Sequence, residues 1–175
     1  LKVLGPDLKG TEDAPIVVVG AGTGFGVSIL IRTGRGDIPV ASEGGHAAFA
    51  PYDGVEAAIW ASLRRTHGRV SIERVLSGPG LYNLYRGLAD VRGARVEHPD
   101  EKAVLAAGQS GDDPLAEETL DRFCEILGGV AGDIALTAGA RGGVYISGGI
   151  APRIATRLAG GGFRRWFEDK GGLAD

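Results

Sequence analysis

The chain has 175 residues, of which 43% are hydrophobic and 23% charged, as in a globular protein rather than a disordered one. Its formal net charge of −3 argues against a general nucleic-acid-binding function, because the phosphates of DNA or RNA select a basic surface. A single cysteine, Cys124, excludes an internal disulfide and a cysteine-rich zinc site, and no apolar run approaches the ~18 residues that a membrane span needs. We therefore expect a cytoplasmic protein with no nucleic-acid or membrane partner.

Two strands joined by a glycine-rich turn are expected first. Residues 16–20 form a continuous apolar, β-branched run, which is typical of a buried strand, and residues 27–32 are strand-like again. Between them lies Gly20-Ala-Gly-Thr-Gly-Phe-Gly26. Because a strand follows this turn, no helix N-terminus is available there as an anion site.

Helices dominate the middle of the chain. Apolar residues at three- and four-residue spacing predict helices over residues 56–65, 81–88, 99–107 and 114–137. Residues 71–76 are compatible with a helical turn that leads into a strand. We expect Gly78-Pro-Gly80 to break the chain before the second helix.

The longest predicted helix, over residues 114–137, has good start signals but a glycine-rich interior. Asp113 is a suitable cap, and Pro114 suits the first turn. Gly128, Gly129 and Gly132 weaken the helix by up to ~1 kcal/mol each relative to alanine. We expect these glycines to let another element pack closely.

The chain then returns to a strand and a further helix. Residues 143–147 are predicted as a buried strand and residues 150–158 as a helix with a proline near its start. Strands that alternate with helices indicate an α/β domain, with no internal repeat.

The glycine-rich turn is the first candidate site. It fits neither the Gly-x-Gly-x-x-Gly dinucleotide motif nor the P-loop, which ends in Gly-Lys-Ser/Thr. A glycine-lined hairpin can instead present successive backbone N–H groups to a phosphate, with the Thr23 hydroxyl as a further donor. The alternative is a tight hairpin in which glycine only supplies a positive φ.

The second candidate site is Glu43-Gly-Gly-His46. A carboxylate and an imidazole on a glycine-opened bend can hydrogen-bond sugar hydroxyls. The alternatives are an acidic loop with a surface histidine, or a metal site, which two ligands support only weakly. Glu73, taken alone, is an ordinary helix-surface charge.

Together these segments resemble the bacterial glucokinases, the hexokinase-like branch of the actin-like ATPase superfamily. The resemblance rests on five segments in the same order: residues 20–26 with the strand after them, 43–51, 73–85, 142–153 and 167–170. It implies a ribonuclease H-like, actin-like ATPase large domain, with a mixed β-sheet flanked by helices.

The resemblance also implies roles for individual residues. Glucose hydroxyls would be bound by three side chains, Glu43, His46 and Glu73. A phosphate-binding turn for ATP would consist of Gly22, Thr23 and Gly24, and the adenosine-binding segment would include Gly148 and Gly149. The implied activity is the transfer of the ATP γ-phosphate to glucose with Mg²⁺, the first step of glycolysis, by a homodimer.

Two parts of the family pattern are not found in this sequence. We expect residues 1–175 to be the large, C-terminal domain, with the N-terminal small domain absent and the C-terminal end cut short. The catalytic base is expected in that small domain, so no catalytic residue and no metal ligand is assigned here, and the chain alone is expected to turn over negligibly. Two alternatives stay open: a non-catalytic sugar-binding or dimerisation module that uses the glycine-rich helix, and a related kinase for another hexose or for acetate.

Overall fold

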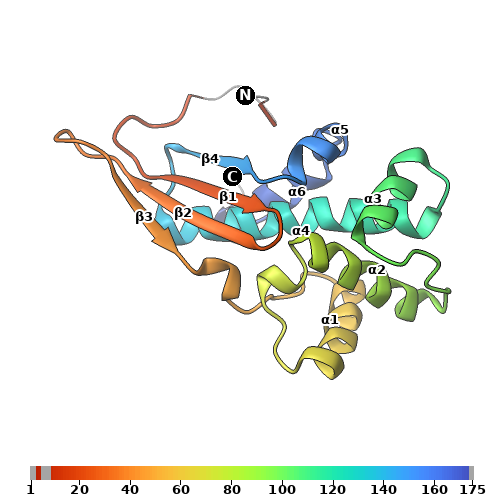
Figure 1. Ribbon diagram of the computed structural model, residues 1–175. Coiled ribbons are helices and arrows are strands. Elements are labelled where there is room, and N and C mark those ends of the chain that lie inside the picture. The colour runs from red at the N-terminus through yellow and green to blue at the C-terminus, as the bar shows by residue number, and fades with distance from the viewer. Residues whose placement is uncertain (1–2, 5–8, 174–175) are drawn as a thin grey trace.

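A computed structural model of the chain describes residues 3–4 and 9–173, which form a sheet with helices packed against it (Figure 1). The strands follow the order β3-β2-β1-β4, with β1 at Ile16–Ala21, β2 at Phe25–Ile31, β3 at Ile38–Ser42 and β4 at Gly143–Ser147. β1 pairs antiparallel with β2 and parallel with β4. The sheet is therefore mixed, and the predicted α/β class is confirmed.

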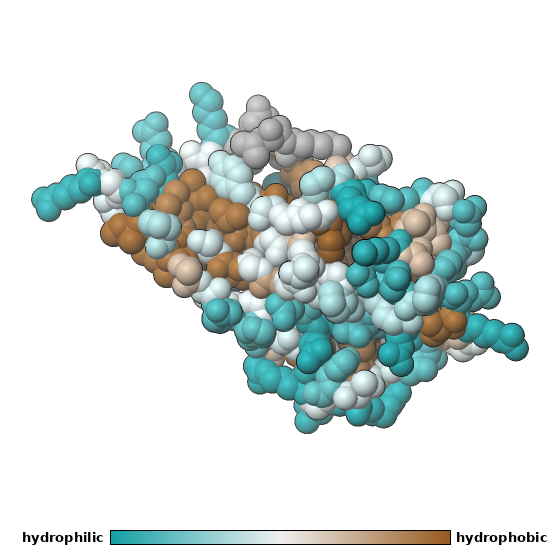
Figure 2. Space-filling view, in the orientation of Figure 1, coloured by the Kyte–Doolittle hydropathy of each residue, from teal (hydrophilic) through white to brown (hydrophobic). Residues whose placement is uncertain are grey.

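The two faces of the sheet differ in burial. Alternate residues of β1, namely Val17, Val19 and Ala21, are fully buried on the face that α4 (Pro114–Ala138) covers. Figure 2 shows hydrophobic surface over the strands on the side that faces the viewer. β4, predicted as a buried strand, is only partly buried, and Tyr145 is 40% exposed.

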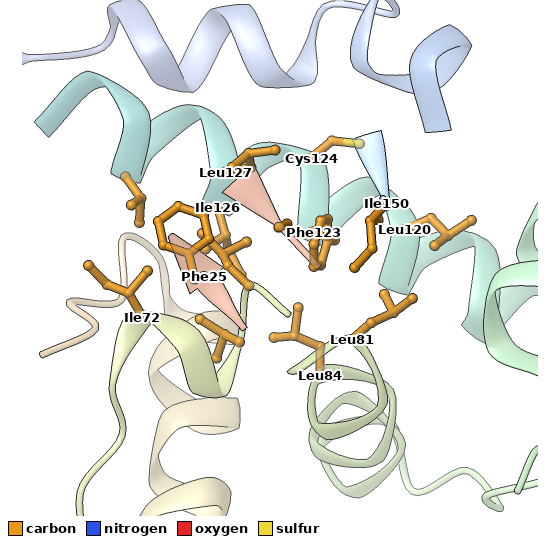
Figure 3. Packing of buried hydrophobic residues seen from close by; sticks show 14 of the residues in the cluster. Phe25, Ile72, Leu81, Leu84, Leu120, Phe123, Cys124, Ile126, Leu127 and Ile150 are labelled. Atoms are coloured by element: carbon orange, nitrogen blue, oxygen red, sulfur yellow. The ribbon is translucent and has the colours of Figure 1, made fainter. Parts of the chain in front are cut away.

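The remaining helices are α1 (Gly54–His67), α2 (Gly78–Arg92), α3 (Glu101–Ser110), α5 (Ala155–Leu158) and α6 (Gly162–Glu168). Of these, α2, α3, α5 and α6 pack against α4, and α1 packs on α2. Short 3₁₀ turns lie between them: η1 (Gly44–His46), η2 (Ile72–Arg74), η3 (Ala151–Ile154) and η4 (Gly171–Leu173). In Figure 3, Phe123 and Ile126 on α4 point toward Leu81 and Leu84 on α2, which closes the core below the sheet.

The predicted chain break at residues 78–80 is wrong, because these residues form the first turn of α2. The Ser77 hydroxyl caps that turn by accepting a hydrogen bond from the Gly80 N–H at 2.9 Å. Proline suits the first turn of a helix, where its missing N–H costs nothing. The preceding segment forms only the turn η2, and α2 follows it in place of the expected strand.

The glycines of α4 serve packing within the chain. A Cβ at Gly128 would overlap the Phe163 carbonyl of α6, and one at Gly132 would lie 2.6 Å from the Phe167 carbonyl oxygen. The expected close packing is confirmed, and its partner is α6. The helix face that the dimerisation alternative assigns to a second subunit is therefore covered by the chain itself.

Among the described helices, none has both the length and the apolar character that a bilayer crossing requires.

Candidate functional site

The glycine-rich turn is a hairpin, as predicted. β1 and β2 pair up to Ala21 and Phe25, and the turn Gly22–Gly24 closes with a hydrogen bond from the Gly22 N–H to the Gly24 carbonyl at 2.9 Å. Within the described part of the chain, the N–H groups of Thr23 and Gly24 and the Thr23 hydroxyl have no hydrogen-bond partner. These three donors are available to an anion.

The alternative role for the glycines, a supply of positive φ, is wrong at this turn. None of Gly20, Gly22, Gly24 and Gly26 has a positive φ. Gly20 leaves room for the Ser147 hydroxyl, which a Cβ would approach to 2.6 Å, and Gly24 leaves room for a Glu73 carboxylate oxygen at 2.5 Å. A Cβ at Gly22 or Gly26 would meet no described atom within 4 Å. Gly20 and Gly24 therefore make room for polar side chains of other segments, whereas Gly22 and Gly26 leave the backbone accessible.

A cavity of about 550 Å³ lies over this turn. It is lined by the turn, by the adjoining parts of β1 and β2, and by side chains from two other segments: Val18, Gly20, Gly22, Thr23, Gly24, Phe25, Gly26, Val27, Ser28, Glu73, Ser147 and Gly148. β1 and β4 are parallel neighbours that both end here, at Ala21 and Ser147. The cavity thus lies outside the carboxyl ends of two neighbouring parallel strands, which is where open α/β sheets commonly bind ligands.

The two glycines of the predicted adenosine segment have different surroundings. Gly148 has a φ of +88°, and a Cβ there would overlap the Ala21 carbonyl. That carbonyl accepts a hydrogen bond from the Ile150 N–H at 3.2 Å, so the segment after β4 is fixed against the end of β1. Gly149 is exposed, and a Cβ there would meet nothing described within 4 Å.

Glu73 lies at the same cavity and bonds directly to the turn. Its Oε2 accepts a hydrogen bond from the Phe25 N–H at 2.9 Å. The Ser77 hydroxyl donates to the Glu73 carbonyl at 2.8 Å, and the Gly78 N–H donates to the Gly22 carbonyl at 2.7 Å. η2 and the start of α2 therefore hold both the carboxylate and the turn in place.

Glu43 directly precedes η1 and His46 ends it, and η1 packs against β2. Their side chains are exposed, with 3.8 Å between the His46 Nε2 and a Glu43 carboxylate oxygen. A Cβ at Gly45 would overlap the Phe25 carbonyl, so the glycines let the bend lie flat on the strand. The Ile72 N–H donates to the Ala47 carbonyl at 2.9 Å, which joins the segment after η1 to η2.

The predicted residues thus form two adjoining groups. Gly22, Thr23, Gly24, Gly148 and Glu73 line one cavity, whereas Glu43 and His46 lie beside it on η1 and Gly149 lies outside its lining. Sequence reasoning missed Ser147, whose hydroxyl donates to the Val19 carbonyl at 3.2 Å inside the same cavity. The sequence signal that could have identified Ser147 is its position directly before Gly148 and Gly149.

A second hollow, of about 690 Å³, lies between α3, α4, α5 and α6. Its lining includes Cys124, which points away from Leu84 in Figure 3. Burial raises the pKa of this thiol to about 12. Since the thiolate is the nucleophile and the side chain is buried, Cys124 is an inert core residue.

Within residues 3–4 and 9–173, no three His, Cys, Asp or Glu side chains are placed to hold a metal ion together. The only carboxylate in the lining of the 550 Å³ cavity is Glu73, which already has the Phe25 N–H as a partner.

Comparison with known proteins identifies the family. The glucokinase family model matches residues 3–175. The chain belongs to the glucokinase family. It is 45% identical over 175 residues to a glucokinase of Caulobacter sp. strain K31, covering 100% of this chain and 53% of that protein. With a glucokinase of Hahella chejuensis the identity is 46% over 167 residues, or 95% and 52% of the two chains. The chain thus spans about half the length of the curated glucokinases it matches.

Solved glucokinases have the same architecture. The structure of a glucokinase from an Antarctic psychrotroph matches with a TM-score of 0.90 at 39% identity, over 95% of this chain and 52% of that chain. A ROK family glucokinase from Streptomyces griseus, in complex with glucose and AMPPNP, matches with a TM-score of 0.60 at 20% identity, over 90% and 52%. The second likeness shows the fold alone. Both confirm the predicted actin-like ATPase fold.

Proposed function

We propose that this chain is the nucleotide- and sugar-binding part of a glucokinase, in which ATP phosphorylates glucose to glucose 6-phosphate. The observation that supports this most directly is the single cavity that unites the bare turn Gly22–Gly24 with Glu73. A phosphate donor and a hydroxyl acceptor must meet within a few ångströms for transfer, so their binding groups must share one opening.

The turn is suited to a polyphosphate. The N–H groups of Thr23 and Gly24 and the Thr23 hydroxyl are free donors, and the glycines at 22 and 26 leave the approach open. Successive free N–H groups on a turn bind anions well because their dipoles point the same way. Gly148 and Gly149, at the end of the neighbouring parallel strand, would then contact the adenosine side of the same nucleotide.

The sugar would lie between Glu73 and the η1 bend. A carboxylate accepts hydrogen bonds from two neighbouring hydroxyls, and a neutral imidazole accepts at one nitrogen and donates at the other. Glu43 and His46 are exposed on η1, which is joined to η2 through the Ala47–Ile72 hydrogen bond. Their side chains are therefore free to turn toward a bound hexose.

Mg²⁺ would reach this site on the phosphates of ATP, because Mg²⁺ in kinases is held largely by substrate phosphates and water. The described residues do not fit a dedicated Mg²⁺ cage, since the cavity lining offers one carboxylate that is already hydrogen-bonded. The chain's own contribution is to orient the two substrates. A homodimer stays a prediction of the family resemblance, and a cytoplasmic location stays a prediction from the sequence.

The test is a coupled phosphorylation assay on the protein that contains this chain. We expect glucose to be used in preference to mannose, N-acetylglucosamine and acetate. If another acceptor is preferred, the proposed substrate changes from glucose to that acceptor, and the proposed phosphate-binding role of the turn is unaffected. Sugar binding with no ATP binding would favour the non-catalytic module instead.

A further inference from the structure

Glu73 lies at the junction between the two halves of the proposed site. It is the one carboxylate in the cavity lining, and it bonds to the backbone of the turn that would hold phosphate. Oε2 accepts the Phe25 N–H at 2.9 Å, whereas Oε1 has no hydrogen-bond partner within the described chain. One oxygen thus fixes the turn, and the other is available to a ligand.

The turn is shaped to receive this carboxylate. A Cβ at Gly24 would lie 2.5 Å from Oε2 and 3.3 Å from the carboxyl carbon, so only glycine admits Glu73 in its present position. The Phe25 N–H directly follows the two free N–H groups of Thr23 and Gly24 along the backbone. The carboxylate is therefore bonded to the peptide next to those two groups.

We propose that Glu73 is a positioning residue that couples sugar binding to phosphate binding. The inference rests on the proposed function. A sugar hydroxyl that donates to Oε1 fixes the carboxylate plane, and the fixed Oε2 holds the Phe25 N–H and with it the turn. The turn is then ordered before the nucleotide arrives, so part of the ordering cost of nucleotide binding is already met. The coupling is reciprocal, as any linkage between two binding equilibria must be.

The test is calorimetric titration of the 175-residue chain with Mg·AMPPNP, in the absence and in the presence of saturating glucose. We expect glucose to tighten AMPPNP binding by roughly fivefold or more. Glu73→Gln keeps an acceptor for the Phe25 N–H, so the chain stays folded, but it removes the charge that both bonds share. In this variant we expect the ratio of the two AMPPNP affinities to fall to about one. A residue with only a structural role would lower both affinities and leave their ratio unchanged.

Glu43→Gln is the matched control. It removes the same charge from a proposed sugar-facing residue whose one described side-chain contact is with His46, so it weakens glucose binding but preserves the ratio once glucose is saturating. The role of Glu73 would be overturned by either of two results. One is a ratio of AMPPNP affinities that falls to about one in Glu43→Gln as well, and the other is a wild-type ratio in Glu73→Gln. If the wild-type chain binds both ligands but glucose does not change the affinity for AMPPNP, the coupling is overturned and the proposed function stands. Failure to bind either ligand would overturn both.

Discussion

Gly45 packs so closely against the backbone carbonyl of Phe25 that the position has no room for a Cβ. The same Phe25 offers its N–H to Glu73, so one peptide segment of β2 contacts both the η1 bend and η2. The segment proposed to face the sugar and the turn proposed to bind phosphate therefore both contact the same strand.

The first prediction concerns this contact. Gly45→Ala should push η1 away from β2 and destabilise the fold by roughly 1–3 kcal/mol. The reason is that the new methyl group would overlap the Phe25 carbonyl, and only a shift of the backbone can relieve that overlap. Urea unfolding measures the change. Gly54→Ala is the control, since a Cβ at Gly54 meets nothing described within 4 Å at the start of α1. Equal stabilities for the two variants would show that the η1 bend is not held by this contact.

The second prediction separates folding from nucleotide binding in the glycine pair after β4. Gly148→Ala should destabilise the chain by 1 kcal/mol or more, roughly, because its φ of +88° and the Ala21 carbonyl both exclude a side chain. Gly149→Ala should leave the unfolding midpoint unchanged and weaken Mg·AMPPNP binding by crowding an exposed backbone. Unaltered AMPPNP affinity in Gly149→Ala would remove that residue from the proposed site.

The third prediction uses two adjacent glycines of α4. Gly128→Ala should destabilise the chain, because the new methyl group would overlap the Phe163 carbonyl and force α6 away. Gly129→Ala should stabilise it by up to about 1 kcal/mol, since its Cβ would make an ordinary contact 3.7 Å from the Trp166 ring and alanine favours the helix. Thermal unfolding of both variants checks this. Equal effects of the two substitutions would contradict the packing of α6 against the Gly128 face.

The fourth prediction concerns Glu56, a buried carboxyl at the start of α1. Its Oε2 accepts the Tyr52 N–H at 2.8 Å, and its Oε1 is unpartnered. Burial raises the pKa of Glu56 from 4.5 to about 7. Asp53, Arg122 and Glu125 face it, and Arg122 bonds to Asp53 and lies 3.6 Å from Glu125. Arg122 is therefore shared among three carboxyls and does not neutralise Glu56 fully.

The sign of the effect follows from the raised pKa. Between pH 4.5 and pH 7 the folded chain holds a proton that the unfolded chain has released, so this contribution is full below pH 4.5 and falls as the pH rises to 7. The total is roughly 3 kcal/mol. Glu56→Gln holds no such proton. The unfolding free energy of the wild type should therefore fall relative to that of Glu56→Gln across this window, as measured by urea unfolding at several pH values. A constant difference would show that Glu56 does not titrate there.

Much of the fold could be predicted, because periodic apolar patterns reflect which face is buried. β1 and α4 are examples, since both contact the core directly. β3 could not be predicted, because all of its residues are exposed and Pro39 interrupts any strand pattern. α6 has only seven residues, too few for a helical period to stand out. The sequence predicts the start of α2 too late, because proline and glycine suggest a break unless the capping role of Ser77 is known.

The candidate site shows the same limit at the level of single residues. The spacing of glycines predicts the bare turn, because neighbouring residues form it. The contact between Glu73 and Phe25 spans 48 positions of sequence and depends on how η2 packs against the hairpin. Without the family resemblance, Glu73 looks like any surface charge. The position of Ser147 in the cavity lining likewise depends on the parallel pairing of β4 with β1, which no local sequence pattern encodes.

The most direct test of the account is amide chemical-shift mapping of the isotope-labelled chain with each ligand in turn. Mg·AMPPNP should move the amide signals of Thr23, Gly24 and Gly149, and glucose should move those of His46 and Glu73. Shifts confined to the hollow around Arg153 and Arg157, with the turn unaffected, would contradict the claim that phosphate and sugar meet over the β1–β2 hairpin.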